Sequence, residues 1–351
     1  MDTNFLIGSS ELNLKFLQPA GRRALSYKNV GGDFQAWRGR CEAKLTELLG
    51  LELPVSPPAG MRELRQADHD GVRVQALVME VDESLSIPAY LLRPARDRGP
   101  GTAVMAIHGH SPGKGEGCLG LKKDGYSGFA MALAKAGYLV LLPIHRGFGP
   151  LNDLSAGRPG YRMDYEQSAH FSYVTDAFLH GRTVVGENVE DLLRWEDYLA
   201  AELSVERIFA AGLSYGGDLA FVYPIFSRRV ERIFASGSSG SYALHFSRCY
   251  NGPAHCVPGI LRWMDRSDVA GLNAPRPLAV HYGQHDTPSL GDSAGENYAA
   301  AYNEAVPGFT EEVRAIYAAA GAAGNVRLIV TPDMGHAMDV DALMAFLSSR
   351  P

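Results

Sequence analysis

The chain has 351 residues, of which 46% are hydrophobic, and its formal net charge is -6 at pH 7. Such a length and apolar fraction suffice for one large core. Lys and Arg are scattered rather than gathered into the basic stripe that binds nucleic acid or an anionic membrane, so neither partner is expected.

The cysteines and the N-terminal residues bear on the cellular compartment. Cys41, Cys118, Cys249 and Cys256 form no C-x-x-C pair and indicate reduced thiols rather than a disulfide framework. The first residues lack the pattern of a secretory signal, and no run approaches the ~20 apolar residues of a membrane span. We therefore expect a soluble, cytoplasmic globular protein.

Residues 1–60 differ in pattern from the rest of the chain. Apolar residues from Phe34 to Leu51 recur at helical spacing with Gly50 as a stop, and three prolines then interrupt the pattern. We expect a helical arm packed on a main domain at 61–351 rather than a separate domain. Its candidate roles are covering a site and contacting a second copy in a homo-oligomer.

Strand and helix patterns alternate along the main domain. The segments 72–81 and 87–92 favour an antiparallel hairpin, and 102–107 is an uninterrupted apolar run, as in a strand buried on both faces. Further strands are predicted at 138–143, 207–211, 232–235, 278–282 and 326–331, and helices at 129–136, 189–203, 294–305, 310–320, 340–347 and from residue 218. The alternation predicts an α/β fold with a mostly parallel, doubly wound sheet flanked by helices. The segment 150–180 has little periodicity and is expected to lie over the site as a lid-like insertion.

The most informative stretch is Gly212-Leu213-Ser214-Tyr215-Gly216-Gly217, between a predicted strand and a helical pattern. Gly-x-Ser-x-Gly in this context is typical of a nucleophile elbow, a turn so tight that a Cβ at the flanking glycines would collide with its neighbours. The pattern predicts that the hydroxyl of Ser214 is held at the carboxyl edge of the sheet, above the N-terminus of a helix.

An elbow serine needs an imidazole to accept its proton and a carboxylate to orient that imidazole. In this arrangement the chain order is Ser, acid, His. Strand 278–282 runs into Asp286 and strand 326–331 runs into His336, so these residues complete the predicted catalytic set with Ser214. Asp333 and Asp339 are competing acids, but both lie in the same loop as His336 and have little reach to its Nδ1.

The tetrahedral intermediate formed on attack by such a serine carries an oxyanion, which needs two backbone N–H donors. The first is expected from Tyr215, at the start of the elbow helix. The second is expected from the loop after strand 102–107. There His110 is favoured and Ser111 is the alternative, because Pro112 has no N–H. Aromatic candidates for the walls of a substrate pocket are Phe148, Tyr161, Tyr165, Phe171, Tyr173, Tyr242, Phe246 and Trp263.

Two other patterns do not carry their usual chemistry. The stretch from Gly109 to Gly115 is one residue short of a phosphate-binding loop and lacks Ser or Thr after its lysine. His108-x-His110, with His145 after the next strand, has no carboxylate or cysteine at ligand spacing for zinc. No metal and no cofactor are expected.

With these residues in place, the chain resembles the α/β-hydrolase superfamily over residues 70–351, and within it the bacterial branch of dienelactone-hydrolase-like and acetyl-xylan-esterase-like proteins. The supporting stretches are 106–110, Gly181-Arg182-Thr183 with Asp191, 212–217, 258–261 and 268–277. The resemblance implies a cofactor-free serine esterase, or carboxylesterase, that acts on a small-molecule ester. Dienelactone hydrolases carry a cysteine where this chain has Ser214.

Two alternatives remain beside the esterase. Gly-x-Ser-Tyr-Gly-Gly also occurs in serine peptidases of the prolyl-oligopeptidase type. In those enzymes the catalytic domain follows a large propeller, for which the residues before the strand at 102–107 are too few. A catalytically silent hydrolase fold used as a binding module is the other reading, and the intact Ser-Asp-His set argues against it.

Overall fold

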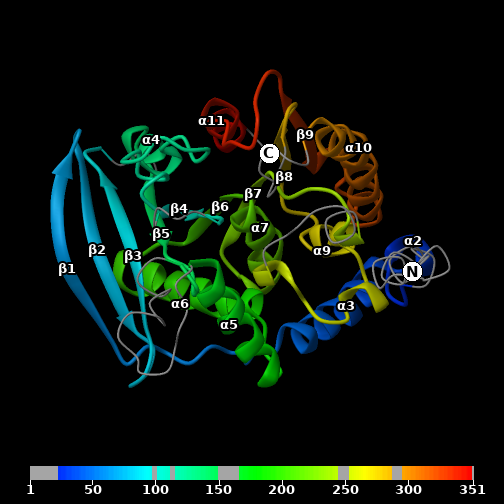
Figure 1. Ribbon diagram of the computed structural model, residues 1–351, viewed down its shortest axis with the longest axis horizontal. Helices are drawn as coiled ribbons and strands as arrows, with labels where there is room; N and C mark the ends of the chain where they lie inside the picture. The colour runs from blue at the N-terminus through cyan, green and yellow to red at the C-terminus, as the bar shows by residue number, and fades with distance from the viewer. Residues whose placement is uncertain are drawn as a thin grey trace, which may run out of the picture.

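Nine strands form one mixed sheet in the computed structural model, which describes residues 23–96, 101–110, 115–148, 166–243, 253–286 and 295–349, with only the backbone for 166–172 and 295–303. The strand order is β1-β2-β3-β5-β4-β6-β7-β8-β9 (Figure 1). Their bounds are β1 (Gly60–His69), β2 (Val72–Glu80), β3 (Ser86–Pro94), β4 (Thr102–Ile107), β5 (Leu139–Pro143), β6 (Arg207–Leu213), β7 (Val230–Ser236), β8 (Leu278–Gly283) and β9 (Val326–Thr331). Strands β1, β2, β3 and β5 pair antiparallel, and all pairs from β5 across to β9 are parallel. The predicted α/β class and mostly parallel sheet are confirmed.

Helices cover both faces of the sheet (Figure 1). On one face, α4 (Phe129–Lys135) and α11 (Val340–Ser348) bury their apolar residues in one cluster. On the other face the helices that share a second, larger cluster are α3 (Phe34–Leu49), α5 (Glu166–Leu179), α6 (Val184–Leu203), α7 (Tyr215–Phe226), α9 (Arg266–Gly271) and α10 (Gly295–Ala319). A short helix, α2 (Tyr27–Val30), precedes α3.

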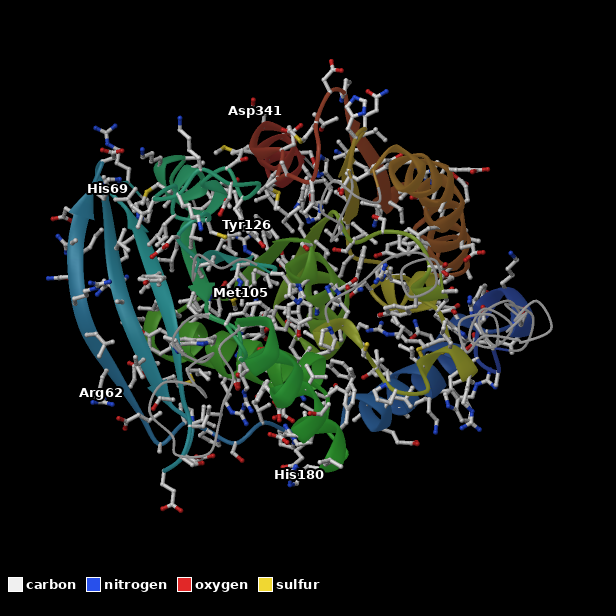
Figure 2. All side chains as sticks on the ribbon, viewed as in Figure 1. Arg62, His69, Met105, Tyr126, His180 and Asp341 are labelled. Atoms are coloured by element: carbon white, nitrogen blue, oxygen red, sulfur yellow. The ribbon has the colours of Figure 1, made fainter. Side chains whose placement is uncertain are left out.

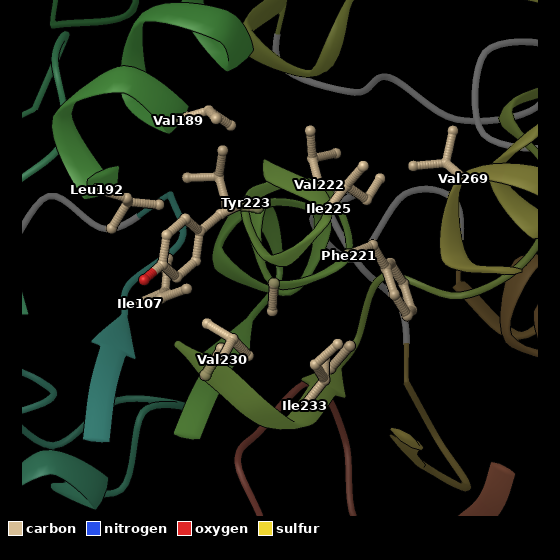
Figure 3. Packing of buried hydrophobic residues seen from close by; sticks show 14 of the residues in the cluster. Ile107, Val189, Leu192, Phe221, Val222, Tyr223, Ile225, Val230, Ile233 and Val269 are labelled. Atoms are coloured by element: carbon tan, nitrogen blue, oxygen red, sulfur yellow. The ribbon is translucent and has the colours of Figure 1, made fainter. Parts of the chain in front are cut away.

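The helix α7 lies at the centre of the larger cluster. Every residue from Tyr215 to Ile225 is buried, as expected for a helix that is apolar on all sides. Figure 3 shows its Tyr223 on the side of the helix toward Leu192 of α6, and its Phe221 on the opposite side, toward Val269 of α9. This packing fixes the N-terminal end of α7, and with it the turn at Ser214.

The N-terminal arm contributes to the same core. Along α3 the buried residues recur at helical spacing and belong to the larger cluster; they are Phe34, Trp37, Cys41, Leu45 and Leu49. The backbone N–H of Glu52 also donates to Glu190 on α6, at 2.9 Å. Within the described ranges, no helix is both long and apolar enough to cross a membrane.

Two predicted helix boundaries are wrong. The helix expected from 189 begins at Val184, because the Thr183 hydroxyl accepts a hydrogen bond from the N–H of Gly186 (3.0 Å) and caps it. The two helices expected at 294–305 and 310–320 are one helix, α10, with Pro307 inside it. Proline removes one helical hydrogen bond, but the fully buried Val306 and Val313 hold both halves against the core.

The strand β1 has no counterpart in the predicted elements. All but its first two residues are exposed, so it shows no apolar pattern, and the backbone ladder to β2 holds it in the sheet. Asp70 and Gly71, with φ of 51° and 79°, make the two-residue turn between these strands. Of the lid-like insertion predicted at about 150–180, residues up to 165 lie outside the described ranges. Residues 166–179 form the helix α5 instead of an irregular segment.

Candidate active site

The candidate site lies where the strand order reverses. The strand β4 has β5 on one side and β6 on the other, so the strands that follow β4 in the chain are added first on one side of it and then on the other. In open α/β sheets, ligands bind at such a switch point, outside the carboxyl ends of the strands. Ser214 follows β6 and His110 follows β4, so both lie at this crevice; Asp286 and His336 follow β8 and β9 at the same edge of the sheet.

The turn at Ser214 is strained and closely packed. Ser214 has φ 63° and ψ -127°, a left-handed backbone that a non-glycine residue rarely adopts, and its N–H donates to the C=O of Ser236 at 2.9 Å. A Cβ on Gly212 would lie 2.1 Å from the carbonyl oxygen of Gly216. A Cβ on Gly216 would lie 2.1 Å from the carbonyl oxygen of Ile107. Only glycine fits at these two positions.

His336 is hydrogen-bonded to Asp286. The distance from Nδ1 to Oδ1 is 2.8 Å; the aspartate side chain is 1% exposed and the histidine side chain 26%. Burial pushes the pKa of His336 down, but the negative charge of Asp286 and the hydrogen bond to it push further up, so the pKa lies above its ordinary value of 6.5. Because the Nδ1–H donates its hydrogen bond to the carboxylate, the lone pair of the neutral imidazole is on Nε2.

Ser214 and His336 border the same turn. The N–H of Ser214 is bonded to Ser236, and the next residue, Gly237, has φ 62°. A Cβ on Gly237 would lie 2.7 Å from Cε1 of His336. The imidazole therefore packs directly on the Cα of Gly237, one residue from the backbone that holds the serine. On its other side, the His336 loop is bonded through the N–H of Met338 to the C=O of Gly125, at 2.7 Å.

The two competing acids make other contacts. Asp339 accepts a hydrogen bond from the Thr331 hydroxyl at 2.6 Å and caps α11 by accepting from the N–H of Ala342 at 2.9 Å. Asp333 has a side chain that is 96% exposed, 3.8 Å from Nε2 of His285. Of the three carboxylates, Asp286 is the one bonded to His336.

Three other histidines near the strand ends are buried. His281 bonds Ser236 Oγ through Nδ1 (2.7 Å) and Thr331 Oγ1 through Nε2 (3.1 Å), and burial lowers its pKa to about 4. Burial likewise lowers the pKa of His108 to about 4, and the His108 Nε2 accepts from the N–H of His145 at 3.1 Å. These imidazoles are neutral at pH 7. Among the described residues, no group of three or more His, Cys, Asp or Glu is arranged to hold a metal ion.

Tyr215 and His110 flank Ser214 from two different loops. Tyr215 opens α7, so its N–H is one of the first-turn donors without an intrahelical acceptor. The N–H of Gly109 donates to the hydroxyl of Tyr126 (2.9 Å), which donates in turn to the C=O of His110 (3.2 Å). A Cβ on Gly109 would lie 2.7 Å from the Cβ of Ser214. The alternative donor, Ser111, lies outside the described residues.

The aromatic pocket candidates separate into groups. Phe148 lies at the site, with its ring 5.2 Å from that of His110 and 6.1 Å from that of Tyr215. Tyr242 packs under the guanidinium of Arg266, and the Tyr173 hydroxyl donates to Glu187. Trp263 faces the N-terminal arm, where Lys44 Nζ is 4.2 Å from its ring. Tyr161, Tyr165 and Phe246 and the side chain of Phe171 lie outside the described part of the chain.

Comparison with known proteins identifies the fold. No family model matches the chain. A Bacillus subtilis (strain 168) protein provisionally named as a hydrolase, YtaP, is 27% identical over 312 residues, covering 85% of this chain and 94% of YtaP. A Bacteroides fragilis structure provisionally named as an acetyl xylan esterase matches with a TM-score of 0.71 at 15% identity, over 92% of this chain and 82% of its own. A Solibacter usitatus glucuronoyl esterase matches with a TM-score of 0.60 at 13% identity, over 93% and 96%. The chain has the α/β-hydrolase fold.

Sequence reasoning assigned no role to two supports of the site in this α/β-hydrolase fold. One is Tyr126, which Figure 2 labels on the side of the sheet covered by α4 and α11; it bridges Gly109 and His110. The other is Asn188, whose amide donates to the Tyr215 hydroxyl (2.9 Å) and accepts from the N–H of Arg146 (2.9 Å). Nothing in the local pattern marks either residue, because each acts on a loop distant in sequence.

A dense network of charges fixes the loop after β5. Arg146 donates to Asp191 with two nitrogens, at 2.7 and 2.8 Å, the fork-shaped geometry of a strong pair. Arg182 pairs with Glu190 at 2.7 Å, and all of these carboxylates belong to α6. The stretch Gly181-Arg182-Thr183 with Asp191, singled out in the sequence, thus ties α6 to its neighbours rather than contributing a reacting group.

Proposed function

We propose that this protein is a serine hydrolase that cleaves carboxylic esters through an acyl-enzyme intermediate. The observation that carries the proposal is the hydrogen bond of 2.8 Å between His336 and the buried Asp286, beside a serine held in a left-handed turn at the start of a helix. The esterase names of two structures with the same fold add support by analogy.

The geometry supports one role for each of these residues. As Ser214 Oγ attacks the ester carbonyl carbon, Nε2 of His336 takes the hydroxyl proton, and Asp286 keeps the imidazole oriented by accepting from Nδ1. The backbone N–H groups of Tyr215 and His110 stabilise the oxyanion. His336 then gives its proton to the departing alcohol as the C–O bond breaks.

Water completes the cycle. His336 takes a proton from a water molecule, whose oxygen attacks the acyl-enzyme carbonyl, and returns a proton to Ser214 as the carboxylic acid leaves. No step of this scheme needs a metal or an organic cofactor. The substrate we propose is a small ester, with Phe148 as one wall of its pocket.

The test replaces the nucleophile. For Ser214→Ala we expect hydrolysis of p-nitrophenyl acetate to fall by about 10⁴–10⁶-fold in kcat, with labelling by a fluorophosphonate abolished. Ser84→Ala, in the exposed hairpin between β2 and β3, is the matched control and should behave as the parent. Ester hydrolysis by Ser214→Ala at the parental rate would exclude the mechanism. Faster cleavage of a peptidyl nitroanilide than of the ester by the parent would indicate a peptidase instead.

A further inference from the structure

A second histidine–carboxylate pair lies beside the candidate oxyanion residues. His255, in the 3₁₀ turn Pro253–His255, is hydrogen-bonded through Nδ1 to Oδ2 of Asp218 on α7. Asp218 is in turn paired with Arg266 on α9, with Nε 3.0 Å from Oδ1 and Nη2 donating to Oδ2 at 3.3 Å. The three residues are 9%, 5% and 1% exposed, so all three lie in the interior.

The His255 ring contacts both residues proposed to hold the oxyanion. It is stacked on the ring of His110, with centroids 5.0 Å apart and planes 18° apart. It meets the ring of Tyr215 edge to face, also with centroids 5.0 Å apart. Since Tyr215 directly follows Ser214 and Gly109 packs on the serine Cβ, His255 borders the reaction centre.

The hydrogen bonding of His255 differs from that of the buried structural histidine His281. Both ring nitrogens of His281 are bonded, to Ser236 and Thr331. The Nδ1 of His255 is bonded to Asp218, whereas its Nε2 makes no hydrogen bond to another described residue, and the residue is 9% exposed. In the neutral imidazole, the Nδ1–H donates to the carboxylate of Asp218, so the lone pair is on Nε2, which can then accept a hydrogen bond.

We propose that Nε2 of His255 accepts a hydrogen bond from a hydroxyl group of the substrate, next to the ester carbonyl, so that the site prefers hydroxylated esters to plain alkyl esters. Asp218 and Arg266 are positioning residues, because they fix the ring through Nδ1. The inference rests on the proposed function and names a specificity residue for it.

Matched ester pairs test the preference and show which side of the ester carries the hydroxyl. Methyl glycolate and methyl acetate differ by one hydroxyl on the acid side. Glycerol monoacetate and propyl acetate differ by hydroxyls on the alcohol side. One net hydrogen bond corresponds to a preference of about tenfold in kcat/KM, and we expect it for the hydroxylated member of at least one pair.

Two variants separate substrate binding from packing. In His255→Gln the side-chain amide reaches the position of Nε2, but no polar atom remains at the position of Nδ1 to bond Asp218. In His255→Asn the amide reaches the position of Nδ1, keeps Asp218 partnered, and leaves Nε2 without a substitute. The proposal therefore expects His255→Asn to lose the roughly tenfold preference and His255→Gln to retain more of it. His180→Asn is the matched control, since that histidine is exposed at the end of α5 (Figure 2).

Each outcome bears on a definite claim. Equal rates within both pairs, in a parent that hydrolyses p-nitrophenyl acetate, overturn the inference and leave the proposed function standing; this comparison needs no variant to fold. The inference is also overturned if His255→Asn keeps the preference while His255→Gln loses it, because the ring would then serve only to partner Asp218. A parent that hydrolyses none of these esters contradicts the proposed function itself.

Discussion

The sheet has an antiparallel half, β1 to β3, and a parallel half, β4 to β9, which differ in burial, strand direction and chemistry. In the parallel half, every residue of β4, β5 and β8 is buried, whereas in β1 all but the first two residues are exposed. Ser214, Asp286, His336 and His110 all follow strands of the parallel half. None of the candidate site residues follows β1, β2 or β3.

Strand direction explains this division. Parallel strands all end at one edge, so loops far apart in sequence meet there. Antiparallel strands end alternately at opposite edges, and such a sheet can leave a face in water. The lesson is that β1 to β3 extend the sheet without supplying reacting groups, and substitutions in the two halves should have very different effects.

The largest difference should come from two aspartates. For Asp286→Asn we expect a loss of about 10⁴-fold in kcat, because the amide favours the wrong tautomer of His336. Asp68→Asn on β1, where the side chain is 74% exposed, should leave the rate unchanged. Initial rates with p-nitrophenyl acetate measure both. Parental activity in Asp286→Asn would mean that this carboxylate does not orient the base.

Two glycines give the next comparison. In Gly109→Ala the new methyl group would lie 2.7 Å from the Cβ of Ser214 and would displace the loop that carries the proposed oxyanion donor His110. We therefore expect kcat to fall by about 10²–10³-fold, the cost typical of a lost oxyanion donor. Gly71→Ala in the β1–β2 turn meets no atom within 4 Å but has φ +79°. It should cost about 1 kcal/mol in the free energy of unfolding without affecting kcat. Chemical denaturation measured beside the rates distinguishes the two effects, and equal kcat losses would remove the distinction between the halves.

The pH profile sharpens the assignment of the base. His336 must be neutral to accept the serine proton, and the charge of Asp286 holds its pKa above 6.5. We therefore expect kcat/KM to fall about tenfold per pH unit on the acid side of an inflection that lies above pH 6.5. In Asp286→Asn that inflection should move to lower pH, because the negative charge that raises the pKa of His336 is removed. An inflection that stays in place would assign the titration to another group.

The smallest effect should be found on the exposed strand. Leu64 of β1 is 61% exposed, so Leu64→Ala should change the free energy of unfolding by no more than about 0.5 kcal/mol. Leu141 of β5 is fully buried, so Leu141→Ala should cost about 2–5 kcal/mol. Urea unfolding of the two variants measures the difference. A large loss in Leu64→Ala would show that β1 is buried against another molecule in solution.

The strands other than β1 and the turn at Ser214 could be predicted because their signals are local. The strand β9 has the predicted bounds, since a short apolar run between a turn and a Pro-Asp sequence has few other conformations available. The turn at Ser214 was recognisable because the glycines on either side have no steric alternative. Asp286 and His336 followed from chain order, given that parallel strands end at one edge.

What the sequence determined by itself was the α/β class, the elbow and the short set of acids and bases that can serve it, because these depend on periodicity and steric limits within a few residues. The tertiary structure alone decided that Pro307 lies within one helix, that β1 joins the sheet, and that His255 is held by Asp218 and Arg266. Each of these depends on contacts between residues distant in the chain. Burial and backbone pairing fix such contacts, and no local pattern records them.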